Sequence, residues 1–236
     1  MEQWLTFARG PLFIATFTFM VLGLGRLVFM EVYQMIGNWL RMRDRNVPWR
    51  KNLIESVYWL IPTGKLTRFK PVMSVTSFLF HIAVIVTPIF LVEHMLLWKS
   101  GLGLGFNLPA IGAELADFLT LGAIVTGLIL LAVRIFDPRA RAISDFWDYA
   151  LLVIIVIPFV TGFIVMHPSL LFTRMQTMLT IHILSGELIF VLMPFTKLAH
   201  VVLFPFTRVS SDFYWRFPAE GPRRVAKALH GDEVSV

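Results

Sequence analysis

Histidine is the side chain through which this sequence could bind a cofactor or move protons. The chain holds six histidines. All except His230 lie in or beside stretches apolar enough to cross a membrane, namely His81, His94, His167, His182 and His200. Ionisable side chains are costly inside a bilayer and are usually functional there. Imidazole binds metals through a neutral nitrogen and titrates close to neutral pH. Any single one of these histidines could instead be a packing residue that is hydrogen-bonded to a neighbouring helix.

The spacing of four histidines predicts two imidazole pairs stacked through a helical bundle. His182 and His200 are 18 residues apart, or five α-helical turns, so one helix would present both on one face. His81 and His94 would lie at matching depths on an antiparallel helix. They are 13 residues apart and out of phase on a straight helix, but Pro88 between them is expected to kink it. Imidazoles facing each other across a bundle are typical of b-type haem binding.

Composition indicates an integral membrane protein. Hydrophobic residues make up 57% of the 236 residues, the mean hydropathy is +0.73, and only 15% of the residues are charged. A membrane-spanning helix needs about 20 mostly apolar residues. Five windows meet this requirement: 11–31, 74–97, 115–135, 148–166 and 181–203. We therefore expect an all-α fold in which residues 1–236 form a single membrane domain with five transmembrane helices.

Charge is distributed unevenly between the two ends of the predicted bundle. Lysine and arginine concentrate in the segment 33–73, the connection 134–147 and the tail 205–236. The other side has only Arg9, Lys99 and Arg174. By the positive-inside rule, the N-terminus is outside and the C-terminus cytoplasmic in a multi-pass protein of the inner (cytoplasmic) membrane. This asymmetry and anionic lipid account for the basic net charge, and nothing suggests nucleic-acid binding.

Two local features refine this organisation. Within the cytoplasmic segment, the stretch from Asn52 to Gly64 is too short to span the membrane and is expected to be an interfacial helix. The start of the chain lacks the basic region and the cleavage site of a signal peptide, so the first window is expected to remain as a helix.

The sequence contains no cysteine. This excludes disulfides, iron–sulfur clusters held by thiolates of this chain, and covalently attached c-type haem, which requires a C-x-x-C-H motif. Any redox cofactor in this chain must therefore have other ligands.

Several stretches carry a resemblance to a known family of membrane cytochromes. They are WLIPTG, FHIAVIVTPIFLVEH, RIFDPRARAISDFWDYALL, PFVTGF, HILSGE and PFTKLAH, and they lie between Trp59 and Arg208. In them the sequence resembles the cytochrome b (gamma) subunit of respiratory nitrate reductase, NarI. It resembles more closely the shorter relatives DsrM, TmcC and HmcE, which belong to membrane redox complexes of sulfur-metabolising bacteria and archaea. The pair His182 and His200, followed by a Phe/Pro/Arg stretch, is the most specific element.

The resemblance implies a cytochrome that binds two b haems through four histidines. His81 and His200 would hold the haem nearer the cytoplasm, and His94 and His182 the haem nearer the outside. In the nitrate reductase type, the second histidine of this span falls at the position of Leu91, which cannot bind iron. His94 instead follows the pattern of the sulfur-metabolism relatives. His167, at the outer end of the fourth window, is the rival ligand for the outer haem.

Other polar residues near the predicted haems are candidates for quinone and propionate binding. His167 could accept a proton from a quinol, and Glu187 could carry a proton or bond to quinone. The plain structural alternatives are an interfacial histidine that ends a helix, and a protonated carboxyl bonded to a backbone carbonyl. Arg26 and Arg134 could pair with haem propionates or contact lipid phosphates.

These features predict an electron-transfer subunit of a respiratory oxidoreductase that is not catalytic alone. Menaquinol or quinone would react near the outer haem, and a cytoplasmic iron–sulfur subunit would exchange electrons at the basic inner surface. In the relatives from sulfur metabolism, including sulfate reduction, that partner is heterodisulfide-reductase-like and is sometimes joined by a periplasmic multihaem cytochrome c and other membrane subunits. The alternative function is a haem-free proton relay, transporter or scaffold, although the chain lacks the duplicated halves of inverted-repeat transporters.

Overall fold

The chain is all-α in the part that the structure describes. The computed structural model describes residues 2–41, 49–50, 54, 58, 70–103, 109–216 and 227. Within these residues there is no β-strand, and the one isolated β-bridge joins Leu91 to Ile111. The contacts divide the chain into two compact units. The first comprises Met1–Met20 with Pro62–Lys197, and the second Val21–Ile61 with Leu198–Val236.

Five of the described helices are long and apolar enough to cross a membrane. They cover Glu2–Arg41, Pro71–Phe90, Ala113–Phe136, Phe146–Met166 and Met175–Phe195. At a rise of about 1.5 Å per residue, 20 residues match the roughly 30 Å hydrocarbon core of a bilayer. The predicted all-α membrane bundle of five spanning helices is therefore confirmed, while the orientation of the termini stays a prediction.

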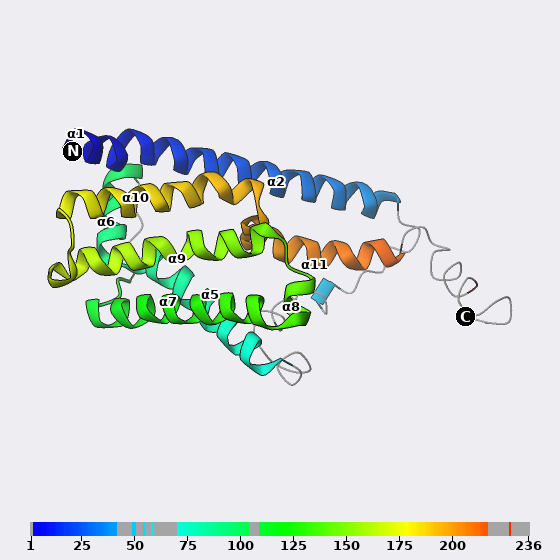
Figure 1. Cartoon of the computed structure of the whole chain (residues 1–236). Coiled ribbons are helices and arrows are strands. Elements are labelled where there is room, and N and C mark those ends of the chain that lie inside the picture. Colours follow the sequence, from blue (N-terminus) through cyan, green and yellow to red (C-terminus); the bar gives the residue numbers. More distant parts are fainter. Residues whose placement is uncertain are drawn as a thin grey trace. The chain divides into compact units, whose positions relative to one another are not determined.

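The helices of the first unit pack in a chain of neighbours (Figure 1). Helix α5 (Pro71–Phe90) packs against α7 (Ala113–Phe136), and α7 packs against α9 (Phe146–Met166). Helix α9 in turn packs against α10 (Met175–Leu192), which also contacts α1 (Glu2–Phe7) and the π-helical turn η1 (Ala8–Leu12). This order brings α9 and α10, the fourth and fifth spans, directly side by side.

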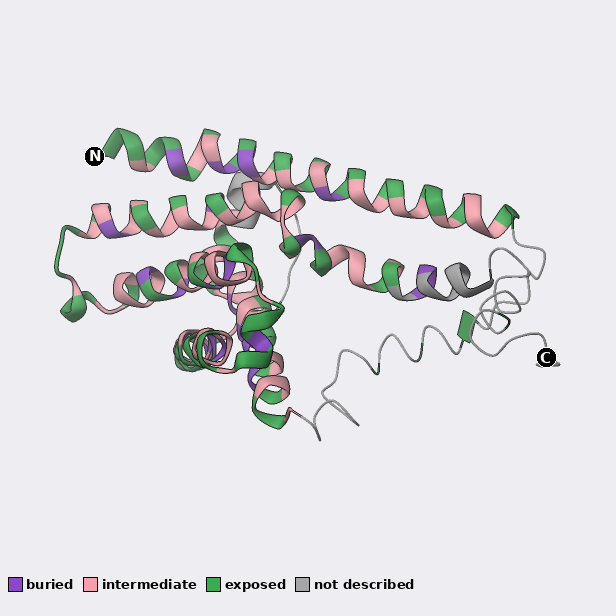
Figure 2. Cartoon of the chain, turned by 45° about the vertical axis from the view of Figure 1, so that its right-hand side comes forward, coloured by how far each residue is buried: buried purple, intermediate pink, exposed green. Residues whose placement is uncertain are grey.

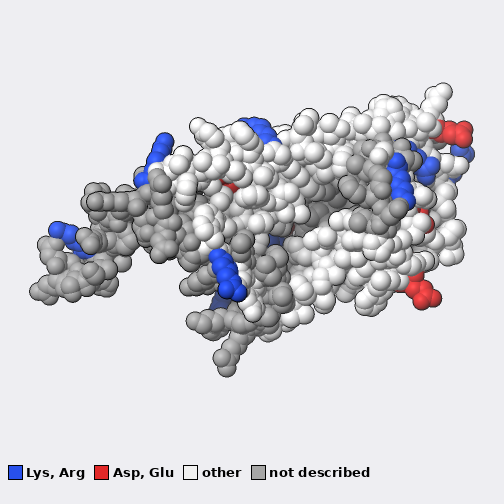
Figure 3. All heavy atoms as spheres, turned by 180° about the vertical axis from the view of Figure 1, so that it is seen from behind, with Lys and Arg blue, Asp and Glu red and all other residues white. Residues whose placement is uncertain are grey.

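Small residues bring α5, α7 and α9 close together. Ala83 and Ala123 are buried with Phe159, and Phe80 is buried with Leu130 and Leu152. Figure 2 shows buried residues on the helix faces that meet and exposed residues on the outward faces. On the face drawn in Figure 3, most of the described surface carries neither Lys or Arg nor Asp or Glu. A surface of large exposed apolar side chains, such as Phe118 and Phe136 at 72% and 79% exposure, is suited to contact with lipid.

The first spanning helix is longer than the predicted window 11–31. Helix α1 continues through η1, which contains Pro11, into α2 (Phe13–Arg41). A proline has no backbone N–H to donate, so it interrupts the hydrogen bonds of the helix. A π-helical turn can accommodate this interruption. Residues 33–41 of the segment predicted as a cytoplasmic connection are thus helical. The predicted interfacial helix 52–64 lies outside the described residues, apart from Ile54 and Tyr58.

In the second unit, the C-terminal part of α2 pairs with α11 (His200–Arg216). Val209 packs against Met35 and Trp39, and the hydroxyl of the buried Ser210 donates a 2.9 Å hydrogen bond to the carboxylate of Glu31. Helix α11 occupies the start of the predicted tail 205–236. Beyond Arg216 the tail lies outside the described residues, except for Lys227.

The second predicted window, 74–97, is interrupted. Helix α5 ends at Phe90, Leu91 is extended with ψ of 134°, and α6 (Val92–Leu102) begins after it. The interruption comes three residues after Pro88. The carbonyl of Phe90 accepts a hydrogen bond from the backbone N–H of Ile111 at 3.0 Å, so the returning loop satisfies part of the broken helix end.

The prediction that one helix carries both His182 and His200 is wrong. Helix α10 ends at Leu192 and is followed by the 3₁₀ turn Met193–Phe195, which contains Pro194. Thr196 is extended, and a second 3₁₀ turn, Lys197–Ala199, precedes α11. Pro194 has no backbone N–H to donate, and the Thr196 hydroxyl instead donates a 2.9 Å hydrogen bond to the Leu192 carbonyl. The five-turn spacing therefore does not describe one helical face.

Candidate functional site

The structure brings the imidazoles of His94 and His182 together inside the first unit. Their ring centroids are 5.9 Å apart and their planes differ by 10°. His94 lies in the first turn of α6, just beyond the break at Leu91, and His182 lies in the middle of α10. Both rings are partly buried. The break therefore determines where the imidazole of His94 can lie.

The proline in α5 also orients the His94 ring. Nδ1 of His94 is 3.2 Å from the Pro88 carbonyl oxygen, six residues earlier in the chain. Because that carbonyl can only accept, Nδ1 carries the proton and donates. The lone pair then resides on Nε2. An imidazole in this tautomer can bind a metal through Nε2.

His182 is held in the same form by α9. Nδ1 of His182 lies 2.9 Å from the Pro158 carbonyl oxygen and 3.3 Å from the Thr161 hydroxyl. Gly162 packs directly on the ring, since a Cβ atom there would lie 2.9 Å from Cε1 and 3.1 Å from Nδ1. Pro158, Thr161 and Gly162 belong to the PFVTGF stretch, so this stretch forms a cradle for the His182 imidazole.

His81 and His200 belong to different units and are both exposed. His81 lies on α5, where its Nδ1 is 2.6 Å from the Ser77 carbonyl oxygen one turn earlier. This contact again places the proton on Nδ1. His200 is the first residue of α11. Their pairing stays a prediction.

His167 has acceptors at both ring nitrogens. It ends α9, where its ring stacks on Phe163 and its Nδ1 lies 2.9 Å from the Phe163 carbonyl oxygen. Its Nε2 lies 3.4 Å from a carboxylate oxygen of Asp117 on α7. Both ring nitrogens therefore face oxygen atoms of the protein, and Nε2 is directed at the Asp117 carboxylate.

Glu187 is buried in α10 without a hydrogen bond. Its side chain is 4% exposed, and neither carboxylate oxygen has a partner among the described residues. The alternative prediction of a carboxyl bonded to a backbone carbonyl is therefore not met in this part of the chain. Native structures contain few such groups, and each calls for an explanation such as a catalytic role or an absent ligand.

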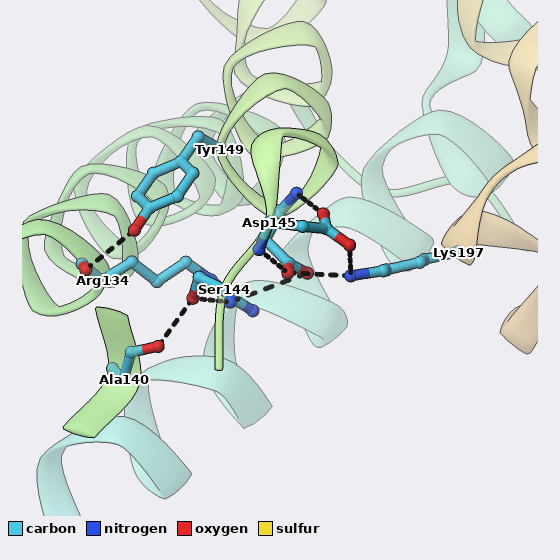
Figure 4. A network of polar contacts seen from close by, with 7 residues as sticks. Arg134, Ala140, Ser144, Asp145, Tyr149 and Lys197 are labelled. Atoms are coloured by element: carbon cyan, nitrogen blue, oxygen red, sulfur yellow. Dashed lines mark hydrogen bonds and ion pairs between the residues drawn. The ribbon is translucent and has the colours of Figure 1, made fainter. Parts of the chain in front are cut away.

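Arg134 is engaged by protein groups at the start of α9 (Figure 4). Its guanidinium donates a 3.0 Å hydrogen bond to Ser144 and lies 3.7 Å from the Asp148 carboxylate. The Tyr149 hydroxyl donates to the Arg134 carbonyl oxygen at 3.2 Å. These contacts give Arg134 a structural role at the junction of α7 and α9. Arg26, the other propionate candidate, is exposed on α2 in the second unit.

Lys197 joins the end of the fifth span to the start of α9. Its ammonium donates to Asp145 at 2.9 Å and to Asp148 at 2.8 Å (Figure 4). Asp145 and Asp148 also form a reciprocal capping box at the helix N-terminus. The hydrogen bond from Lys197 holds the pKa of Asp145 below its ordinary value, and the same bond raises the pKa of Lys197.

Sequence reasoning missed the residues that orient the histidines. Thr161 and Asp117 were not predicted, because a threonine in an apolar helix and an acid near a helix start are common structural features. The sequence feature that could have indicated these contacts is the proline inside α5 and inside α9. Pro88 and Pro158 both present carbonyl oxygens to imidazoles, a relationship that depends on tertiary contacts and is invisible in spacing alone.

The possible metal ligands of the described residues are dispersed. No group of three or more His, Cys, Asp or Glu residues gathers in this part of the chain to hold an ion. Haem needs fewer protein ligands, because the macrocycle supplies four nitrogens and the protein supplies the axial positions. His94 and His182, whose ring centroids are 5.9 Å apart, would be the two imidazoles of the first unit available to such a group.

Comparisons with known proteins give one relative of uninformative name. The chain is 39% identical over 153 residues to a protein of Nitratidesulfovibrio vulgaris strain Hildenborough that is named simply "Protein". The match covers 64% of this chain and 65% of that relative, slightly less than two thirds of its length. No family model matches the chain, and no solved structure matches it.

Proposed function

We propose that the protein is a dihaem b-type cytochrome that transfers electrons within a membrane respiratory complex. The observation that carries this proposal is the near-parallel pair of His94 and His182 at a centroid separation of 5.9 Å. Nδ1–H of each ring donates a hydrogen bond to a proline carbonyl, which keeps the lone pair on Nε2.

His94 and His182 would hold the outer haem, and His81 and His200 the inner one. The Nδ1 contact of His81 with the Ser77 carbonyl supports the same tautomer as in the outer pair. When bound, haem would supply one-electron transfer, and the helices that carry these histidines would hold the ligating imidazoles. His94 is favoured over His167 as the outer ligand, because both nitrogens of His167 face acceptors.

His167 and Glu187 are the proposed proton-handling residues of a quinone site near the outer haem. Oxidation of menaquinol releases protons, and an imidazole beside a carboxylate is suited to receive one. Nε2 of His167 lies 3.4 Å from the Asp117 carboxylate, which would be the neighbouring group in a proton path. The buried, unbonded carboxyl of Glu187 would carry a proton or bond to the quinone.

The proposed setting is the inner membrane of a bacterial cell, with the C-terminus in the cytoplasm. A cytoplasmic iron–sulfur subunit of the heterodisulfide-reductase-like type would exchange electrons at the basic inner surface. A periplasmic multihaem cytochrome c and other membrane subunits are further proposed partners. The segments richest in lysine and arginine, including Arg41 and Lys51, support this side as the docking surface for protein and anionic lipid.

A haem-to-protein ratio tests the proposal directly. The haem content of the purified chain is measured by pyridine haemochrome. Its midpoint potentials are measured by a redox titration followed by absorbance. Two b haems per chain, with two resolved midpoint potentials, are the expected result. A folded preparation without haem would overturn the proposal. The buried Glu187 would then favour the second candidate, a haem-free proton relay or transporter, and proton uptake into proteoliposomes would be the next measurement.

A further inference from the structure

Thr161 is a buried hydroxyl placed against the ring of His182. It lies on α9 and is 9% exposed. Its hydroxyl oxygen is 2.9 Å from the Ile157 carbonyl oxygen, 3.3 Å from the Pro158 carbonyl oxygen and 3.3 Å from Nδ1 of His182. A hydroxyl has one proton, and Ile157 offers the nearest acceptor. Thr161 therefore donates to Ile157 and turns a lone pair toward His182.

Nδ1 of His182 consequently faces two acceptors. The Pro158 carbonyl oxygen lies at 2.9 Å and the Thr161 hydroxyl oxygen at 3.3 Å. Only the tautomer with its proton on Nδ1 can donate to either group. We infer that Thr161 is a positioning residue that, together with Pro158, holds His182 in the tautomer whose Nε2 carries the lone pair.

The two histidines of the pair differ in this support. For His94 the structure gives one acceptor at Nδ1, the Pro88 carbonyl oxygen at 3.2 Å. A stronger hydrogen bond from Nδ1–H makes the opposite nitrogen a better electron donor. A second consequence rests on the proposed function. If His182 holds the outer haem, Thr161 stabilises the oxidised iron and lowers the midpoint potential of that haem.

The test compares Thr161→Val, which keeps the shape but removes the hydroxyl, with Thr161→Ser, which restores it. Thr126→Val is the matched control, because Thr126 is also buried and donates to the carbonyl four residues earlier, that of Gly122. Histidine is labelled with ¹⁵N, and the spectra are recorded on the dithionite-reduced protein. The His182 signals are assigned by their loss in His182→Gln. Midpoint potentials and haem content are measured on the same preparations.

Thr161→Val is expected to shift the Nδ1–H signal of His182 toward that of a weaker hydrogen bond, whereas Thr161→Ser and Thr126→Val resemble the unaltered chain. With haem content unchanged, the ratio of oxidised to reduced outer haem at fixed potential should fall three- to tenfold. For a one-electron couple this is a rise of about 30 to 60 mV. Unchanged His182 signals in Thr161→Val would overturn the inference. If the unaltered chain contains no haem, the proposed function fails, and the ¹⁵N spectra alone decide the role of Thr161.

Discussion

His94 and His182 stand with their imidazole planes 10° from parallel and their centroids 5.9 Å apart, although they come from helices that begin more than 80 residues apart in the chain. Each ring is oriented by the carbonyl of a proline, Pro88 for His94 and Pro158 for His182. Pro88 near the end of α5 and Pro158 inside the continuous helix α9 thus contribute carbonyls to one site. The arrangement predicts distinct effects for substitutions at the pair, in its cradle and in the groups around it.

Replacing His94 should remove one haem, whereas replacing His167 should not. His94→Leu deletes one of the two rings and is expected to lower the pyridine haemochrome ratio from two haems per chain to one. His167→Leu should retain two, since both of its nitrogens face Phe163 and Asp117. The opposite pattern, with haem lost only in His167→Leu, would move the outer ligand to α9.

Gly162→Ala should disturb the His182 ring. The added Cβ would lie 2.9 Å from Cε1 of the imidazole, so the ring or the helix must move. We expect a loss of about 1–3 kcal/mol in the free energy of unfolding from overpacking, together with reduced haem content. Thermal unfolding in detergent and the haemochrome assay measure these effects.

Gly186→Ala on α10 is the matched control for this substitution. A Cβ at Gly186 meets nothing within 4 Å, and alanine favours a helix by about 1 kcal/mol over glycine. Equal behaviour of the two alanine variants would show that the close approach of α9 to the ring is unimportant.

The spanning helices could be predicted because hydrophobicity over about 20 residues depends on local composition alone. The ends of these helices were less predictable. Pro88 signals an interruption, but the chain becomes extended only at Leu91, where the returning loop at Ile111 competes for the freed backbone groups. The continuous helix expected up to His200 is wrong because α10 ends just before Pro194.

The candidate site was predictable to the level of depth in the membrane. Depth along two antiparallel helices predicts that His94 lies near His182, and the structure brings these rings together. The groups that orient the rings were not predictable, because the carbonyl of Pro158 and the hydroxyl of Thr161 reach His182 from another helix. Likewise, nothing in the local sequence pairs Lys197 with Asp145, 52 residues away.

Removing the Lys197 ammonium should change the acid limb of the stability profile. Lys197 holds the pKa of Asp145 below its ordinary 3.8, so this pair contributes stability above pH 3.8 that is lost as the pH falls through the lowered value. Lys197→Met should lower the melting temperature at pH 7, and its profile should converge with that of the unaltered chain in acid. Arg141→Met, in the exposed connection before α9, is the control. Parallel profiles for Lys197→Met and the unaltered chain from pH 7 to pH 3 would contradict the coupling.

The same ion pair predicts a second transition in alkali. The hydrogen bond to Asp145 raises the pKa of Lys197 above its ordinary 10.5, so the stabilisation is fully present below pH 10.5 and disappears as the pH rises through the raised value. Lys197→Arg keeps a charge that does not titrate in this range. It should therefore retain more of its melting temperature at high pH than the unaltered chain does. If both chains lose stability in parallel through this range, titration of Lys197 is not the cause.

Glu187 should separate stability from function. Its buried carboxyl makes no hydrogen bond among the described residues, so Glu187→Leu should raise the free energy of unfolding by about 1–3 kcal/mol by removing an unsatisfied polar group. Glu187→Gln keeps the shape but cannot carry the proton, and positioned acid–base groups contribute roughly 100- to 10,000-fold to rates. Both variants are therefore expected to slow haem reduction by menaquinol at least tenfold, with haem content and reduction by dithionite unchanged.

The control for the Glu187 variants is Glu114→Gln, which changes an exposed acid in the first turn of α7. Menaquinol reduction at the unaltered rate in Glu187→Gln would remove Glu187 from the quinone site. A stabilised Glu187→Leu would then leave its carboxyl without any role in this reaction.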